Sequence, residues 1–259
     1  MSLPQPYQQI KKILDLSLSL AKVKFKLRNE GSYLGIFWYL LEPLSAFAIL
    51  LLLGGALSQH NIIDHYPIYL FIGIIIFNFF RAVSTLSIGA VVSNAGFIKS
   101  MKIAQEPFVI SGLIQYLFSH LFELLILVAL MLYSKMSLIG LVAYPIILLF
   151  LCLFTLGLSF ILATVGVFIR DMTNVWGIVM RLLWFGTPIF YTVKKATLLH
   201  TANLYNPLFY FILAVRDTVI DQKLPAETTL AVIFWGSIIS FGAGLWIFIK
   251  YKNKFAEKL

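Results

Sequence analysis

Four ionisable residues lie inside long apolar stretches of this 259-residue chain. They are Glu42, Arg81, Glu123 and Arg181. A charge at the centre of a bilayer costs roughly 2.5–3.5 kcal/mol on insertion scales, so such a residue normally faces protein or a water-filled cavity. Arg81 could pair with Glu123 on the neighbouring span. Glu42 and Arg181 lie near the predicted inner ends of spans, where their side chains can extend to water.

The cysteine and histidine residues give no support to a metal or redox centre. Cys152 lies within a span, and His60, His65, His120 and His200 form no closely spaced ligand set. The sequence contains no G-x-S-x-G nucleophile elbow. It also lacks the glycine-lysine step of a phosphate-binding loop. We therefore expect a protein that is not itself an enzyme and that binds no metal or cofactor. A pump of this kind must draw on an ion gradient or on a separate ATPase subunit.

Membrane spans are the elements that position these residues. Apolar residues make up 60% of the chain and charged residues 12%, and about 20 apolar residues cross a hydrocarbon core of roughly 30 Å. The sequence predicts an all-α integral membrane protein with one transmembrane domain over residues 1–259. No short apolar region with a cleavage site opens the chain, so a signal peptide is not expected. The predicted spans are residues 36–57, 67–92, 107–133, 138–169, 174–191 and 229–249.

Residues 7–31 precede the first span and carry a different pattern. Lysines alternate there with apolar residues at roughly helical spacing, which is typical of an amphipathic helix lying in the membrane interface. A membrane anchor with no other task is an equally good interpretation of the composition. The apolar residues are Ile10, Ile13, Leu14, Leu16, Leu20, Val23 and Leu27.

The distribution of Lys and Arg predicts the orientation of the chain. Cytoplasmic loops retain positive charge, and placing both termini in the cytoplasm puts most of the basic residues on that side. Because these residues are scattered among separate loops, the net charge of +9 indicates topology and anionic lipid, and nucleic acid binding is not expected. The cytoplasmic set is Lys11, Lys12, Lys22, Lys24, Lys26, Arg28, Lys99, Lys102, Arg170, Lys250, Lys252, Lys254 and Lys258.

Two further segments depart from simple spans. Gly35 and Pro43 flank an aromatic cluster at the start of the first span, where the chain should bend from the membrane surface into the bilayer. Residues 192–228, on the predicted outer side, are too long for a turn, and their apolar part is too short to cross. We expect the outer segment to re-enter the membrane or to lie on its surface.

The order of these features resembles the type-2 ABC exporter permeases of the polysaccharide export class, which carry O-antigen, capsular polysaccharide or teichoic acid. Residues 170–176 and 187–191 are similar to that family's junction of the fourth and fifth spans, and Asn206 and Arg216 lie in a long final outer loop. The resemblance covers nearly the whole chain. Its opening signature is formed by Arg28, Leu34, Gly35, Trp38, Leu41, Pro43 and Leu44.

The resemblance implies a partner and a place for it. In such permeases the loop after the second span, here residues 93–106, forms a coupling helix that binds an ATPase subunit. Two copies of the chain would join two ATPase subunits, which hold ATP and Mg, in the inner membrane of a bacterium. Phe97 and Ile98 would be the apolar anchors and the lysines would meet an acidic rim. The candidate contacts are Asn94, Gly96, Phe97, Ile98, Lys99, Met101, Lys102, Arg170 and Asp171.

The resemblance also implies a path for a lipid-linked polysaccharide within the membrane. It gives Arg81 a second interpretation, in which the side chain lines a path for an anionic glycolipid head. The candidate path residues are Phe37, Trp38, Tyr39, Arg81, Trp184, Phe185, Phe190 and Tyr191, and the candidate gate residues are Leu34, Gly35, Glu42, Pro43, Asn206, Pro207 and Arg216.

The cargo class and the mechanism keep alternatives. Teichoic acid export is the alternative within the family. A gradient-driven secondary transporter would predict internal repeats and broken helices at mid-membrane, and no convincing repeat is present. A membrane enzyme acting on lipid-linked sugars would need a carboxylate or histidine cluster at one interface. Neither of the last two explains the amphipathic start together with the loop after the second span.

Overall fold

The computed structural model describes residues 5–30, 33, 35–56, 63–100, 103–193 and 197–259, and within these ranges every regular element is a helix. This confirms the all-α prediction. The long helices are α1 (Gln5–Asn29), α2 (Trp38–Ala56), α3 (Tyr66–Ile88), α5 (Glu106–Tyr133), α6 (Tyr144–Phe168), α7 (Met172–Gly186), α9 (Pro207–Val219) and α10 (Glu227–Tyr251). The short ones are α4 (Ala95–Ser100), α8 (Leu198–Leu204) and α11 (Phe255–Lys258), with 3₁₀ turns at Gly35–Phe37, Val92–Asn94, Leu138–Ala143 and Lys252–Lys254.

Four described helices are long and apolar enough to cross a membrane: Tyr66–Ile88, Glu106–Tyr133, Leu138–Phe168 and Glu227–Lys258. The pair α8 and α9, bent by 93° at its break, would make a fifth if it counts as one span. Each of the six predicted segments contains a helix, but α7 has only 15 residues and the apolar part of α2 is short. The six-span topology therefore stays a prediction.

The fifth predicted segment ends earlier than the sequence suggested. Residues 174–191 were expected to form one span, but helix α7 ends at Gly186. Pro188 accounts for the end, because a residue before proline is pushed out of the helical region, and Thr187 has extended backbone angles. Residues 187–191 thus form a non-helical strap at the end of α7.

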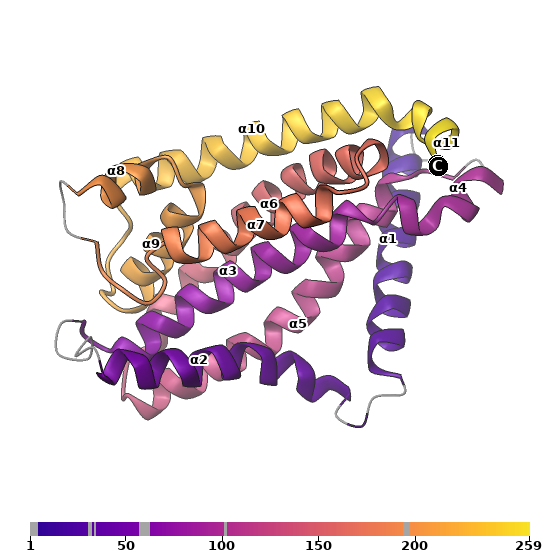
Figure 1. Cartoon of the computed structure of the whole chain (residues 1–259). Coiled ribbons are helices and arrows are strands. Elements are labelled where there is room, and N and C mark those ends of the chain that lie inside the picture. Colours follow the sequence, from indigo (N-terminus) through magenta and orange to yellow (C-terminus); the bar gives the residue numbers. More distant parts are fainter. Residues whose placement is uncertain (1–4, 31–32, 34, 57–62, 101–102, 194–196) are drawn as a thin grey trace.

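Helix α3 is the centre of the molecule. It packs against α2, α5, α6, α7 and α9, and most of its residues between Tyr66 and Ile88 are buried. In Figure 1, α3 runs between α2 and α7, while α1, α4 and α11 gather at one end and α8 and α9 at the other. Any site that involves α2, α3 and α7 therefore lies partway along the length of the molecule.

Helices α6 and α10 pack together closely because small residues face each other. A side chain at Gly157 would collide with the backbone of Ser240, and one at Gly244 would collide with Gly157 itself. The hydroxyls of Ser237 and Ser240 donate to the carbonyls of Phe150 and Phe154 at 2.8 and 2.9 Å. The small residues on these two helices thus form a packing face within one chain.

Helix α1 packs along α5. Ser17 and Ala21 are fully buried against the rest of the protein, and the Lys24 ammonium donates to the Ser111 hydroxyl at 2.9 Å. Burial lowers the pKa of Lys24. The location of helix α1 in the membrane interface stays a prediction. The apolar residues of α1 that remain exposed are Ile10, Leu14, Leu18, Val23 and Leu27.

Candidate functional site

A charged cluster joins the second turn of α2 to the C-terminal half of α3. The Arg81 Nη2 donates to Glu42 Oε1 at 2.8 Å and to Asn78 Oδ1 at 3.4 Å. Both charged side chains remain about half exposed, at 42% for Arg81 and 58% for Glu42. The pairing of Arg81 with Glu123 that the sequence suggested is wrong, because Glu42 lies within reach of the guanidinium and Glu123 binds elsewhere.

Glu123 belongs to a second, buried network between α5 and α6. The His120 ring contacts Glu123 Oε2 through Nδ1 at 2.6 Å and the Tyr144 hydroxyl through Nε2 at 2.6 Å. All three residues are buried. His120 and Glu123 are three residues apart on α5, so their side chains meet on one face of the helix. Tyr144 lies on α6, and its place in the network could not be predicted from the sequence. The network gives a partner to each ring nitrogen of a buried histidine.

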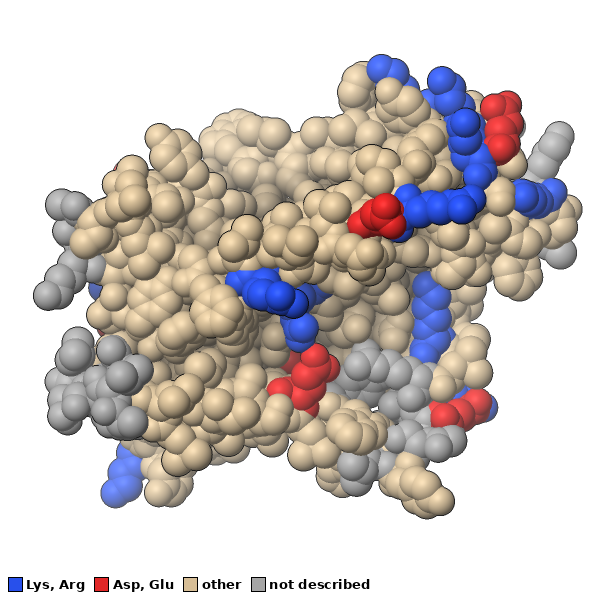
Figure 2. Space-filling view, viewed as in Figure 1, with Lys and Arg blue, Asp and Glu red and all other residues tan. Residues whose placement is uncertain are grey.

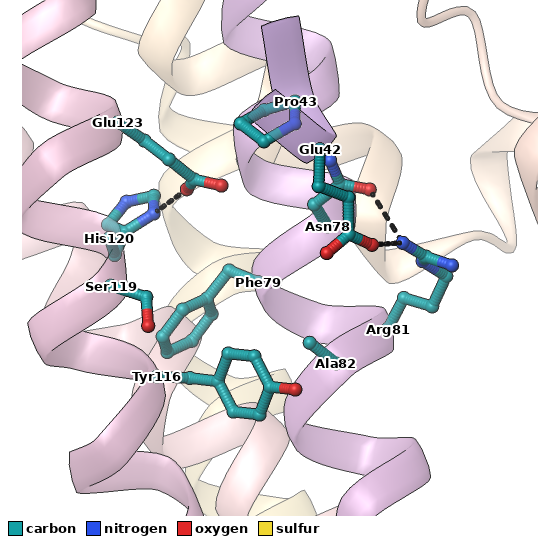
Figure 3. Close-up of a pocket in the computed structure, with 10 residues that line it drawn as sticks. All are labelled: Glu42, Pro43, Asn78, Phe79, Arg81, Ala82, Tyr116, Ser119, His120 and Glu123. Carbon is teal, nitrogen blue, oxygen red and sulfur yellow. Dashed lines mark hydrogen bonds and ion pairs between the residues drawn. The ribbon is translucent and has the colours of Figure 1, made fainter. Parts of the chain in front are cut away.

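A small cavity separates the two polar groups (Figure 3). Glu42, Asn78 and Arg81 lie on one side of it and His120 and Glu123 on the other. Its volume is about 30 Å³, far below the several hundred Å³ of ordinary ligand pockets. This cavity is therefore too small to serve as a path for a sugar or a lipid head group.

A larger cavity of about 440 Å³ opens on the other side of the Arg81–Glu42 pair. Residues of α2, α3 and α7 line it. Two arginines and one glutamate line it, so it carries an excess positive charge. No described acidic side chain forms an ion pair with Arg181. The polar and aromatic lining residues are Glu42, Phe77, Asn78, Arg81, Thr85, Arg181 and Trp184.

Charged side chains of both signs meet on the face of the molecule shown in Figure 2, well away from the end where most of the basic side chains gather. A cavity of this size is in the usual range for a small-molecule or head-group site. Ionisable residues within apolar membrane segments are candidates for a ligand or ion pathway by default. The cavity between α2, α3 and α7 is therefore the candidate functional site.

The structure brings together only some of the predicted path residues. Arg81 and Trp184 line the larger cavity. The Trp184 ring packs edge-on against Phe77, with 4.9 Å between the ring centres. Phe37, Trp38 and Phe185 are more than half exposed on the surface. The side chain of Tyr39 lies outside the described residues. Sequence reasoning did not include Asn78, Thr85 or Arg181 in the path, although Arg181 had been noticed as a charge within a span.

Phe190 and Tyr191 lie in the strap of residues 187–191, and Arg216 binds that strap. The Arg216 guanidinium donates to the carbonyls of Pro188 and Ile189 at 2.8 Å each, and to the Tyr69 carbonyl at 3.0 Å. Its Cζ lies 3.3 Å from the centre of the Tyr69 ring, as in a cation–π contact. Arg216 is thus buried with partners for all three of its nitrogens.

Neighbouring side chains complete the support of the strap. The hydroxyls of Tyr66 and Tyr69 donate to the carbonyls of Phe190 and Tyr191 at 3.2 and 3.0 Å. Asn206 donates to the Thr187 hydroxyl at 2.8 Å and caps the start of α9, where Pro207 is the first residue. Non-helical backbone inside a membrane needs hydrogen-bond partners within the protein. These donors supply such partners to the strap. The gate role of Asn206, Pro207 and Arg216 stays a prediction.

Four of the predicted gate residues lie in the sequence around the start of α2: Leu34, Gly35, Glu42 and Pro43. Gly35 has φ +46°, a left-handed conformation that glycine adopts readily, and it opens the turn before the helix. Pro43 lies inside α2 and is buried. Leu34 lies outside the described residues. The bend expected near Gly35 coincides with the break between α1 and α2.

The predicted coupling loop folds into a 3₁₀ turn and helix α4. Phe97 is 58% exposed, whereas Ile98 is 7% exposed and packs in a core with Phe108, Phe248 and Phe255. The expectation that both apolar residues contact a partner is therefore wrong for Ile98, whose side chain is used inside the chain. Gly96, Lys99, Arg170 and Asp171 are exposed, Asn94 donates to the Ala90 carbonyl at 2.8 Å, and Met101 and Lys102 lie outside the described residues.

Curated relatives match almost the whole chain, although no protein-family model matches it. The O-antigen export system permease protein RfbA of Klebsiella pneumoniae is 28% identical over 95% of this chain and 96% of its own length. RfbA of Myxococcus xanthus is 24% identical over 94% and 95%. The polysialic acid transport protein KpsM of Escherichia coli is 23% identical over 82% and 84%. These matches confirm that the chain resembles the type-2 ABC permeases of the polysaccharide export class.

Proposed function

We propose that the chain is the membrane subunit of an ATP-driven exporter that moves a lipid-linked polysaccharide outward across the cytoplasmic membrane. The observation that carries this proposal is the similarity to O-antigen export permeases over about 95% of the chain. Six spans, with both termini in the cytoplasm, are the topology that we propose for it. Because one relative is a polysialic acid transport protein, we propose capsular polysaccharide as well as O-antigen as the cargo class.

The energy would come from a separate ATPase subunit bound at α4. Phe97 and Lys99 are exposed on this helix, and α4 lies at the end of the molecule where basic side chains gather (Figures 1 and 2). An exposed aromatic ring with cations around it suits a partner cleft that has an apolar centre and an acidic rim. Arg170 and Asp171, exposed between α6 and α7, would add contacts to the same partner.

The complex would contain two copies of the chain and two ATPase subunits. The cavity between α2, α3 and α7 is partly open and about 440 Å³ in volume, so on its own it does not enclose a path for a polymer. A path of that width would lie between two copies related by a two-fold axis. Teichoic acid remains the alternative cargo, and a gradient-driven carrier is the alternative from another class.

The test is co-purification of the tagged chain with a candidate ATPase subunit expressed in the same cells. Phe97→Asp should cut ATPase recovery at least tenfold, because it places a charge at the centre of the proposed contact. The control is Leu224→Asp, which changes a still more exposed apolar residue in the predicted outer segment, and should leave recovery unchanged. Ile98→Asp is unsuitable because it would disrupt the core around Phe108 and Phe255.

Two outcomes would contradict the proposal. If the native chain retains no ATPase at equal expression, the source of energy is wrong and a gradient-driven carrier becomes the better explanation. If Phe97→Asp and Leu224→Asp both retain it fully, α4 is not the docking site. Export of surface polysaccharide in cells that lack the gene, with and without the native chain, tests the cargo class separately.

A further inference from the structure

We propose that Arg81 and Arg181 form a binding site for a lipid-borne phosphate group, and that Glu42 acts as an internal counterion that the phosphate displaces. The inference deepens the proposed function, on which it rests, because it names the chemical group of the cargo that the cavity would hold. It is carried by three observations: the two arginines share one cavity, Arg81 makes both of its contacts through one nitrogen, and Arg181 has no described acidic partner.

The geometry leaves hydrogen-bond donors of Arg81 open to a ligand. Both of its contacts, to Glu42 and to Asn78, use the same nitrogen, Nη2. No described residue accepts a hydrogen bond from its Nε or Nη1. A guanidinium presents its donors as a planar fork that matches two oxygens of one phosphate. Arg81 could therefore hold a phosphate even while it still contacts Glu42.

The charges of the cavity also favour a phosphate over a neutral sugar. Two guanidinium groups face one carboxylate, so the cavity has one unbalanced positive charge when Glu42 is ionised. A phosphodiester carries about one negative charge, and a phosphate monoester carries about 1.5 to 2. A phosphate would balance the surplus charge of Arg181, and its second charge would replace that of Glu42 at Arg81.

The remaining lining residues suit the rest of a lipid. Ala46, Phe77 and Met180 present apolar surface beside the charged groups, and the cavity is partly open. A lipid head group could thus lie against the arginines while its hydrocarbon chain extends into the bilayer. The small cavity behind the Arg81–Glu42 pair is too small to accept either part.

A structural interpretation of the same contacts makes a different prediction. If Glu42 and Arg81 only tie α2 to α3, then removing either residue should weaken the site or leave it unchanged. If Glu42 competes with a ligand, then its removal must strengthen binding. Substitutions of Glu42 and of the arginines should therefore act in opposite directions.

The experiment measures binding of farnesyl diphosphate, a short-chain prenyl diphosphate, to the purified full-length chain by isothermal titration calorimetry in a zwitterionic detergent. Arg181→Gln and Arg81→Gln should each weaken binding about tenfold or more, since hydrogen bonds to a charged group are lost. Glu42→Gln should tighten binding several-fold. The control, Lys135→Asn, removes one positive charge outside the cavity at a left-handed backbone position that asparagine tolerates, and should change nothing.

Three further probes identify the source of the phosphate. Farnesol lacks the phosphate and should not bind in an arginine-dependent way. Inorganic pyrophosphate tests whether the anion suffices without a chain, and phosphatidylglycerol tests whether an ordinary anionic lipid of the bilayer is accepted. Arginine-dependent binding of any phosphate probe supports the site and names its source. Equal binding of farnesol and farnesyl diphosphate, or binding by Glu42→Gln that is no tighter than that of the native chain, would overturn it.

The outcome is separable from that of the proposed function. Phosphate binding is measured on the chain alone, whereas ATPase docking is measured at α4. Loss of the phosphate result with ATPase recovery intact would remove this inference and leave the exporter proposal standing. The reverse pattern would leave a phosphate site in a transporter of another class. The melting temperature of each variant must match the native chain for the comparison to count.

Discussion

Two regions of the molecule use arginine in opposite ways. At the strap of residues 187–191, Arg216 is buried and donates to the backbone carbonyls of Tyr69, Pro188 and Ile189. In the cavity between α2, α3 and α7, Arg81 is 42% exposed and makes its contacts through one nitrogen. Both residues belong to apolar stretches of sequence, yet their surroundings give them different tasks.

The difference shows how a structural arginine can be told from a candidate binding residue. A buried arginine whose three nitrogens all bind backbone carbonyls has most of its donors engaged, and the chain depends on it because those carbonyls have lost their helical partners. An arginine that faces a cavity with unused donors contributes little to the fold and keeps its capacity to bind. The comparison yields predictions about stability that can be ranked by size.

Arg216→Gln should have the largest effect on the fold. The variant loses hydrogen bonds to three carbonyls and leaves buried acceptors unsatisfied, which costs at least about 3 kcal/mol. Arg216→Lys should be nearly as harmful, because an ammonium cannot reach all three acceptors with one planar fork. Thermal unfolding of the detergent-purified chain, with yield after size-exclusion chromatography, measures the change. A melting temperature equal to that of the native chain would contradict the anchoring role.

Asn206→Ala should have an intermediate effect. The Asn206 side chain accepts from the Leu208 N–H at the start of α9 and donates to the Thr187 hydroxyl, so the variant loses a helix cap and one tie to the strap. The loss of a cap costs about 1 kcal/mol. Asn206→Asp is the matched comparison, because it keeps the cap acceptor and loses the amide donor. It should therefore fall between the native chain and Asn206→Ala in a thermal unfolding series.

The sequence predicted the kind of fold well because helical spans depend on composition. Long apolar runs interrupted by few charges make an all-α membrane protein the expected result, and each predicted segment contains a helix. The pairing of charged residues could not be derived in the same way. Arg81 lies 39 positions from Glu42 in the chain, and only the packing of α2 on α3 decides that Glu42, and not Glu123, is its partner.

Burial within short helices was equally hard to predict. Phe97 and Ile98 are adjacent apolar residues in a basic loop, and the sequence treats them alike. A helix turns by about 100° per residue, so consecutive side chains face different directions, and the neighbouring α11 covers only one of them. Similarly, the predicted span of residues 174–191 ran past Pro188, although α7 ends at Gly186. The donors that support the following strap come from α3 and α9, far away in the sequence.

Arg81→Gln should have the smallest effect on stability, and it completes the comparison with Arg216. An ion pair between partly exposed side chains contributes about 0–1 kcal/mol, and the other contact of Arg81, to Asn78, is long at 3.4 Å. The melting temperature should therefore change by a few degrees at most, while Arg216→Gln should lower it much further under identical conditions. Raising the salt concentration should shrink the difference between native chain and Arg81→Gln, because exposed charges are screened. A fall in melting temperature as large as that of Arg216→Gln would mean that Arg81 supports the fold. Arg81 could then no longer be interpreted as a residue free to bind a ligand.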